Sequence, residues 1–308
     1  MALLALIWVV VFGWVALFNG RVQCNTDLDE SLLSLGANER VDDLIDLRIV
    51  TYNIQDLWVV GRNRPKRMRA LAEELAEHDP DIVGFQEAFI SKDRQILIEG
   101  LKERSRLQHF QYFRSATVGS GLLIASAFPI REASFHRYTV SGNWYKLWEG
   151  DWWAGKGVGL ARIELPNQIG LVDFFNTHAQ AGYGNSRYRE VRRQQMEELA
   201  QFIRVTNPAQ RPAFLVGDMN CEVEDEDCLT CIEGADLIRV MDVPSRIDHI
   251  FARKSPYFEF GVFFSLEIRD RDGLRLSDHN GYLSHVWIMP IQSVEVEKEV
   301  QHEVLSQM

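Results

Sequence analysis

The stretch Asp81-Ile82-Val83-Gly84-Phe85-Gln86-Glu87 is an apolar run that ends in an amide and a carboxylate. Its length and its aliphatic and aromatic residues predict a buried strand over Asp81–Gln86. A carboxylate placed directly behind a buried strand must be paired or bound to a cation, because an isolated buried charge is costly. Carboxylate oxygens are ligands that suit Mg²⁺. The stretch therefore predicts a strand that delivers Glu87 to a metal site.

Strands and helices alternate on both sides of this stretch. Lys66–His78 is expected to be a helix, because its apolar residues recur at helical spacing and Pro80 ends it. The other expected helices are Gln95–Leu101 and Ser186–Val205, and the other expected strands are Leu47–Asn53, Gly121–Ala127, Gly157–Leu165, Ile169–Asn176, Ala213–Gly217, Ile247–Phe251 and Tyr282–Ile288. This order indicates one layered α/β domain over residues 47–290, with its site on loops at the strand ends.

The composition is that of a globular domain with an acidic balance. Hydrophobic residues make up 46% of the chain and charged residues 25%, which excludes a disordered protein. The net charge is −11. Stable nucleic-acid binding is not expected, because it depends on clustered Lys and Arg against the phosphates.

The two ends of the chain differ from this domain. Residues 2–18 are apolar throughout, and the first charge is Arg21. Residues 1–20 are interpreted as either an export signal or an uncleaved membrane anchor. The protein is therefore expected to be membrane-associated or secreted/periplasmic. Residues 21–46 are expected to be a linker and residues 291–308 an acidic, solvated tail.

The four cysteines are Cys24, Cys221, Cys228 and Cys231. Export would permit disulfides, and four cysteines allow three pairings, among which the sequence does not choose. Cys228 and Cys231 form a single C-x-x-C, with no second metal-spaced pair. The preferred interpretation is a local disulfide that pins the loop after Cys221.

Polar residues also mark the ends of other predicted strands. They form five strings: Thr51-Tyr52-Asn53, Asn176-Thr177-His178, Gly217-Asp218-Met219-Asn220, Arg246-Ile247-Asp248-His249 and Ser277-Asp278-His279-Asn280-Gly281. Asp218 and Asn220 are two residues apart, so both side chains point to the same side of an extended segment. Taken alone, Asn53 reads as a strand-end turn, and a lone His178 is more often structural than catalytic. The joint order of the strings is more informative than any one of them.

With Gln86-Glu87 in second place, these strings resemble the signature of the endonuclease/exonuclease/phosphatase, or deoxyribonuclease-I-like, superfamily. The resemblance covers about Leu47 to Ile288. It implies an α/β (α+β) fold, a four-layer sandwich of two facing mixed β-sheets flanked by helices. It also implies cleavage of a P–O ester bond around a divalent cation, with Glu87, Asp218 and His279 lining one cleft.

One further segment resembles the neutral sphingomyelinase branch of that superfamily. Glu149–Gly159 is similar to the loop in which those enzymes carry an Asp and a Lys around an aromatic pair, here Asp151 and Lys156 around Trp152-Trp153. Similar stretches are Gly119–Leu122, Pro129-Ile130, and the positions Tyr188, Arg192, Gln195, Glu198-Leu199 and Phe202-Ile203. The alternatives are core packing for the two tryptophans and a solvated loop charge for Lys156.

The sequence departs from the animal enzymes of this branch at two places. Those enzymes have a second His and then a Glu after the Thr-His string, where this chain has Gln180 and Gly182. The segment between Asn220 and Asp248 is short, with few residues for an additional substrate flap. These departures concern the head group of the substrate and leave the core chemistry in place.

The resemblance implies a role for each site residue. Glu87 is the expected principal Mg²⁺ ligand with Asn53 beside it, Asp278 lies at the metal or just outside it, and Mn²⁺ is an alternative ion. His279 is the expected general base, oriented by Asp248, while Asp218 orients the attacking water or serves a second metal. Asn53, Asn220 and His178 are expected near the phosphate, where Asn220 and His178 donate hydrogen bonds and His178 helps to protonate the leaving group. Lys156, controlled by Asp151, is expected to bring a positive charge to the phosphate.

The resulting functional hypothesis is a phosphoric diester hydrolase of the sphingomyelinase type. It would hydrolyse a phospholipid such as sphingomyelin to ceramide and phosphocholine by in-line attack of water, at a membrane surface. The alternatives are an exported endonuclease or phosphatase of the same fold, and a catalytically inactive domain that binds membranes. The sequence leaves the head group and the oligomeric state open.

Overall fold

The computed structural model of the protein describes residues 44–57, 63–115, 119–141, 155–166, 169–182 and 186–291. The predictions for the apolar N-terminal segment, for Cys24, for Asp151 with Trp152 and Trp153, and for the tail beyond Ile291 lie outside these ranges. None of the helices in these ranges combines the length and the apolar character that crossing a bilayer requires.

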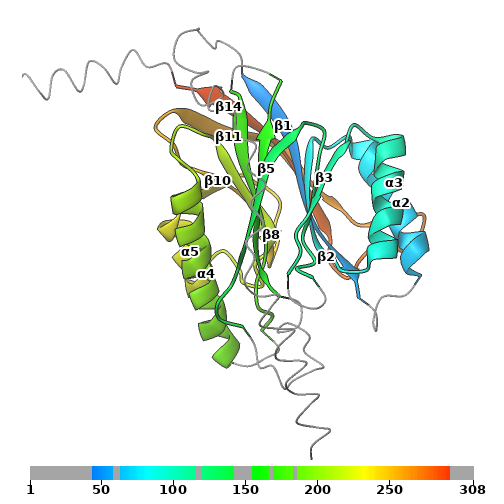
Figure 1. Ribbon diagram of the computed structural model, residues 1–308, viewed down its shortest axis with the longest axis horizontal. Helices are drawn as coiled ribbons and strands as arrows, with labels where there is room; N and C mark the ends of the chain where they lie inside the picture. The colour runs from blue at the N-terminus through cyan, green and yellow to red at the C-terminus, as the bar shows by residue number, and fades with distance from the viewer. Residues whose placement is uncertain are drawn as a thin grey trace, which may run out of the picture.

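Two six-stranded sheets face each other in the centre of the molecule, and helices cover both outer faces (Figure 1). The first sheet has the order β11-β14-β1-β2-β4-β3 and the second the order β5-β6-β7-β8-β10-β9. Parallel and antiparallel neighbours occur in both sheets, because β1 pairs parallel with β2 but antiparallel with β14, and β7 pairs parallel with β8 but antiparallel with β6. The predicted four-layer sandwich of two mixed sheets is confirmed.

The elements have the following bounds. The first sheet comprises β1 (Ile45–Asp56), β2 (Ile82–Ala88), β3 (His109–Tyr112), β4 (Leu123–Ser126), β11 (Phe258–Ile268) and β14 (Gly281–Pro290). The second comprises β5 (Ile130–Arg137), β6 (Gly157–Glu164), β7 (Leu171–His178), β8 (Ala213–Asp218), β9 (Leu237–Arg239) and β10 (Asp248–Arg253). Helices α2 (Arg64–His78) and α3 (Ser91–Arg104) cover the first sheet, α4 (Ser186–Thr206) and α5 (Glu226–Gly234) cover the second, and β12 (Asp270–Arg271) pairs with β13 (Leu274–Arg275).

The alternation of side chains along β1 explains how the strand contributes to two cores. Leu47 and Ile49 pack between the two sheets, whereas Val50, Tyr52 and Ile54 pack against α2 and α3. Successive side chains of a strand point to opposite faces. Asn53 continues the series 47, 49, 51, so its side chain enters the space between the sheets. A strand that is buried on both faces thus carries near its end a buried amide that faces the second sheet.

The sheets approach each other closely just before the strand ends that carry the polar strings. A Cβ atom on Gly84 of β2 would lie 2.4 Å from Val216 Cγ2 of β8, so this approach requires glycine. Beside it, Gln86 Nε2 donates to Asn176 Oδ1 (2.7 Å), and Asn176 Nδ2 donates to the carbonyl oxygen of Phe85 (2.9 Å). These fully buried amides join β2 to β7 and fix the spacing of the two sheets.

Some predicted boundaries are corrected by the structure. Strand β1 begins at Ile45, two residues before its predicted start at Leu47, because Ile45 pairs with Ile288 of β14. Four of the strands in the two sheets, β3, β5, β9 and β11, were not predicted. Strand β11 lies at the edge of its sheet and leaves Phe263 and Phe264 exposed, so its sequence lacks a clean inside–outside alternation.

The predicted local disulfide is wrong. Cys221, Cys228 and Cys231 are free and buried, and the expected loop contains helix α5. Residues three apart lie on the same face of a helix. Cys228 and Cys231 therefore both point into the core between α5 and the second sheet, where they pack as small apolar side chains. The short segment from Asn220 to Asp248 thus builds part of the outer layer.

Candidate active site

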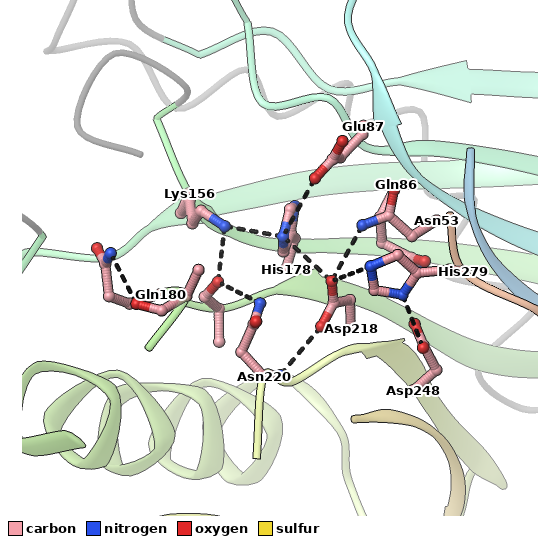
Figure 2. Close-up of polar contacts among 12 residues, drawn as sticks. Asn53, Gln86, Glu87, Lys156, His178, Gln180, Asp218, Asn220, Asp248 and His279 are labelled. Carbon is pink, nitrogen blue, oxygen red and sulfur yellow. Dashed lines mark hydrogen bonds and ion pairs between the residues drawn. The ribbon is translucent and has the colours of Figure 1, made fainter. Parts of the chain in front are cut away.

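The polar strings converge at one end of the two sheets (Figure 2). Strand pairing brings them together, because Asn53 lies opposite Gln86 in β1 and β2, and Asp218 lies opposite both His178 of β7 and Asp248 of β10. The structure brings Glu87, Asp218 and His279 together: His178 Nε2 lies 3.9 Å from Glu87 Oε1 and 3.4 Å from Asp218 Oδ2, which in turn lies 3.8 Å from His279 Nε2. Both sheets contribute to the site.

Asp218 lies at the centre of the site and is almost completely buried, with 2% of its surface exposed. Its Oδ2 accepts a hydrogen bond from Asn53 Nδ2 (3.0 Å), and its Oδ1 accepts one from the backbone N–H of Asn220 (3.0 Å). Two imidazole nitrogens also face Oδ2, His178 Nε2 at 3.4 Å and His279 Nε2 at 3.8 Å. Asp218 therefore connects residues of both sheets around one carboxylate.

His279 and Asp248 form a hydrogen-bonded pair across the two sheets. His279 Nδ1 donates to Asp248 Oδ2 (2.9 Å), which leaves Nε2 facing Asp218. Burial opposes a charge on the imidazole, but the hydrogen bond and the charge of Asp248 outweigh it and raise the pKa of His279 above its usual value. Asp218 and Asp278 add to this rise. The pair has the arrangement of a base and the carboxylate that orients it.

Glu87 is the next-to-last residue of β2 and lies at the rim of the same site. Its backbone is in the left-handed region, with φ of 58°, and the pairing of β2 with β1 shifts register beside it, before Ala88 pairs with Asp56. Burial raises the pKa of its carboxyl to about 7, against the lowering effect of Lys156 and Asn53, and the nearby Asp218 and Asp278 raise it further. Several carboxylates thus crowd together. That is the environment that a bound divalent cation relieves.

The donor set of this site fits a hard divalent cation. The oxygens of Glu87, Asn53, Asp218 and Asp278 are of the type that Mg²⁺ prefers. Ligand atoms of Asp218, Asp248 and His279 also lie within 4.8 Å of one another. We assign the Asp248 carboxylate to His279 rather than to a metal, because its Oδ2 already accepts the imidazole proton. Glu87, Asn53, Asp218 and Asp278 remain the candidate ligands.

Lys156 enters the site from the start of β6 and is buried, with 4% of its surface exposed. Its Nζ donates to the carbonyl oxygen of Ala179 (2.7 Å) and to His178 Nε2 (2.8 Å). The alternative interpretation of Lys156 as a solvated loop charge is therefore wrong. Burial and the adjacent Lys156 hold the pKa of His178 well below its usual value, so the imidazole is neutral and accepts at Nε2.

Asn220 follows β8 and uses the same backbone carbonyl as Lys156. Its Nδ2 donates to the Ala179 oxygen (3.2 Å), and its own backbone is left-handed, with φ of 54°. Gly217, just before Asp218, permits this arrangement, because a Cβ atom there would lie 2.2 Å from the carbonyl oxygen of Thr177. The Lys156 ammonium and the Asn220 amide, which are both candidate hydrogen-bond donors to the substrate phosphate, thus lie next to one carbonyl oxygen.

The sequence did not reveal every residue that builds the site. Gln195 of α4 is fully buried, and its Oε1 accepts from the backbone N–H of Gln180 (2.8 Å), next to Ala179. Gln55 and Arg67 tie the loop of Asp278 to β1. Gln195 was noted only through the family resemblance, and no spacing pattern marks Gln55 or Arg67, because their roles depend on backbone carbonyls and on one unusual φ angle.

Comparisons with known proteins agree with this arrangement. The chain is 29% identical over 279 residues to a putative neutral sphingomyelinase of Drosophila melanogaster, covering 81% of this chain and 62% of the relative. It is 34% identical over 184 residues to human sphingomyelin phosphodiesterase 2, covering 59% and 43%. It is 36% identical over 144 residues to an inositol phosphosphingolipids phospholipase C of Schizosaccharomyces pombe, covering 47% and 33%. The chain thus spans between a third and two thirds of the length of these relatives.

A solved structure supports the fold. The chain resembles beta toxin from Staphylococcus aureus, in a structure with bound magnesium ions, with a TM-score of 0.61 at 18% identity, covering 78% of this chain and 99% of that one. The family model described as Endonuclease/Exonuclease/phosphatase family matches residues 50–279, which include every candidate site residue from Asn53 to His279. By this match and by its two-sheet architecture, the chain belongs to the endonuclease/exonuclease/phosphatase family, in which it resembles the sphingomyelinase-like branch.

Proposed function

We propose that the protein is a Mg²⁺-dependent phosphodiesterase that hydrolyses a phospholipid such as sphingomyelin to ceramide and phosphocholine. The observation that carries this proposal is the pairing of His279 with Asp248 at 2.9 Å, with the free ring nitrogen directed at Asp218. A base, the carboxylate that orients it and a buried acid are thus combined beside Glu87 and the Lys156 ammonium. Hydrolysis of a phosphodiester needs these groups.

Glu87 and Asn53 would hold the cation, with Asp278 and Asp218 at its edge. When bound, Mg²⁺ supplies positive charge to the non-bridging oxygens of the phosphate. Burial raises the pKa of Glu87, and the nearby Asp218 and Asp278 raise it further, which supports this assignment. We propose Mg²⁺ as the bound cation, with Mn²⁺ as the alternative.

The protein groups divide the remaining chemistry among them. His279 Nε2 takes a proton from a water molecule, which Asp218 orients for attack on phosphorus in line with the leaving oxygen. The Asp248 carboxylate accepts a hydrogen bond from His279 Nδ1 and stabilises the imidazolium that forms. Asn220 and Lys156 donate to the phosphate oxygens as charge develops there. His178 is proposed mainly as the neutral acceptor that aims Lys156, because its Nε2 is occupied by the ammonium in this structure.

The lipid substrate is supported by the names of the relatives, which act on sphingomyelin or on inositol phosphosphingolipids. Both substrates place a phosphodiester next to a ceramide. The apolar residues 2–18 support a membrane-associated or exported protein that meets its substrate at a membrane surface. The net charge of −11 supports a lipid over a nucleic acid.

The test offers several phosphodiesters to the full-length protein in detergent micelles. Sphingomyelin, an inositol phosphosphingolipid, a lysophospholipid and DNA are supplied in parallel, with Mg²⁺ and with EDTA. Mg²⁺-dependent release of phosphocholine that is lost in His279→Ala is the expected result. Release of inositol phosphate alone would assign an inositol rather than a choline head group to the substrate. Cleavage of DNA alone would overturn the proposal in favour of a nuclease.

A further inference from the structure

Gln55 has an uncommon backbone conformation beside the candidate cation site. It lies in β1 two residues after Asn53, with φ of 47°. Residues other than glycine seldom adopt this left-handed region, and glutamine is not among those enriched there. The pairing of β1 with β2 shifts register between Asn53 and Asp56, so the strand is irregular at this point. Irregular strand ends of this kind often re-aim a side chain next to an active site.

The main chain and the side chain of Gln55 contact two candidate ligands. Its backbone N–H donates to Asn53 Oδ1 (3.1 Å), and its Nε2 donates to Asp278 Oδ2 (2.7 Å). The first contact can form only while the backbone keeps its bend after Asn53. The second orients a carboxylate that is otherwise exposed. One residue therefore aims an oxygen from β1 and an oxygen from the loop before β14.

Arg67 of α2 stabilises this bend through hydrogen bonds to the main chain. It is 5% exposed, and its guanidinium donates to the carbonyl oxygens of Gln55 (2.8 Å), Ile54 (3.0 Å) and Leu276 (2.6 Å). Leu276 directly precedes the Ser277-Asp278-His279 string. The planar fork of an arginine can join several fixed acceptors at once, which an ammonium cannot do in the same geometry. The end of β1 and the loop that carries Asp278 are thus joined through one buried side chain.

We propose that Gln55 is a positioning residue for the cation site, which aims Asn53 Oδ1 and Asp278 Oδ2, and that Arg67 fixes the backbone in which it does so. The inference rests on the proposed function, because it needs a cation held between these oxygens. Partners that orient metal ligands typically contribute 10–100-fold to metal affinity. Gln55 does this without adding a charge, so it orients the Asn53 amide and the Asp278 carboxylate without competing for the ion.

Two substitutions separate the side-chain contact from the backbone bend. Gln55→Asn keeps a residue that tolerates positive φ but is one methylene too short to reach Asp278. Gln55→Met keeps the length of the side chain and removes the donor. The matched control is Gln95→Asn on helix α3, because Gln95 Nε2 also donates to a carboxylate, Glu99 Oε1 (2.8 Å), on an exposed helix face.

Binding of Mn²⁺ to the full-length protein in detergent micelles, followed by electron paramagnetic resonance of the free ion, is the main measurement. We expect the Kd for Mn²⁺ to rise about 10–100-fold in Gln55→Asn and Gln55→Met and to stay unchanged in Gln95→Asn. Activity should recover in both Gln55 variants at saturating Mg²⁺, because the cation affinity changes and the base does not. A Kd within twofold of wild type in both folded variants overturns the proposal.

Glu87→Gln distinguishes failure of this inference from failure of the proposed function. If wild type binds Mn²⁺ more tightly than Glu87→Gln but the Gln55 variants bind like wild type, only the role of Gln55 is wrong. If wild type and Glu87→Gln bind alike, the cation site itself is wrong, and the role of Gln55 fails with it. Thermal unfolding of each variant establishes that the compared proteins are folded.

Discussion

Asp248→Asn is the substitution that tests the chemistry of the site most directly. Asp248 is 4% exposed, and its Oδ2 accepts the Nδ1 proton of His279 at 2.9 Å. Asparagine has the same shape but no charge, and its NH₂ group can face the imidazole and favour the wrong tautomer. The backbone pairing of Asp248 with Asp218 should be unaffected. The change therefore affects the base and leaves the strand in place.

The expected loss follows from the hydrogen bond. A hydrogen bond to a charged group contributes about 1.5–3 kcal/mol, and each 1.36 kcal/mol corresponds to a tenfold change in rate. Asp248→Asn should therefore lower kcat by about 10–10²-fold through this bond, and by more where the tautomer is also inverted. The KM for the lipid should change little, because Asp248 is buried behind the imidazole.

The assay is phosphocholine release from sphingomyelin at saturating Mg²⁺. The chain offers a matched control, since Asp46 accepts from His285 Nε2 (2.7 Å) in a second His–Asp pair, between β1 and β14. Asp46→Asn removes the same kind of contact near the start of β1, far along the strand from Asn53, and should leave kcat unchanged. A folded Asp248→Asn protein with kcat within twofold of wild type would refute the role of this pair.

Four further predictions concern the frame of the site. Lys156→Met should lower kcat/KM for sphingomyelin by about 10²–10³-fold, because a preorganised hydrogen-bond donor to the phosphate is lost; an unchanged kcat/KM would contradict this role of Lys156. Gln195→Leu leaves the backbone N–H of Gln180 without its acceptor and should lower kcat in the same assay; Gln195→Glu, which keeps an acceptor, should restore part of it. Gly84→Ala should destabilise the fold by about 1–3 kcal/mol in denaturant titrations, because the sheets must separate around the new methyl group. Burial lowers the pKa of His249 to about 4. Below pH 6.5 the imidazole therefore becomes protonated in the unfolded chain, whereas in the folded chain it stays neutral down to about pH 4. The free energy of unfolding should therefore fall by up to about 3 kcal/mol from pH 6.5 to pH 4, and His249→Gln should flatten that slope.

The sequence predicted those parts of the fold that depend on regular alternation. β1 and β2 were foreseen because long apolar runs end in polar residues, and the convergence of Asn53 with Gln86 follows from the parallel pairing of the two strands. Helix α4 was foreseen from its apolar spacing. In each case, local pattern and tertiary burial favour the same structure.

The remaining features depend on contacts that have no local pattern. Lys156 is buried only because the Ala179 carbonyl and His178 lie opposite it, on a neighbouring strand. The bend at Gln55 is held by an arginine on another element, and the three thiols are core residues because α5 forms where a loop pinned by a disulfide was expected. Such features arise from the fold as a whole and cannot be read from a single segment.

The catalytic groups are divided between the two sheets, with Asn53, Glu87 and His279 on one and Asp218 and Asp248 on the other. Either half alone would lack a complete set of reactive groups. During folding or synthesis, turnover can therefore start only after the last layer has docked. A cut between β4 and β5 leaves Asn53 and Glu87 on one fragment and Asp218, Asp248 and His279 on the other, so hydrolysis should return only when both fragments are mixed, and the rate of its return would report their association.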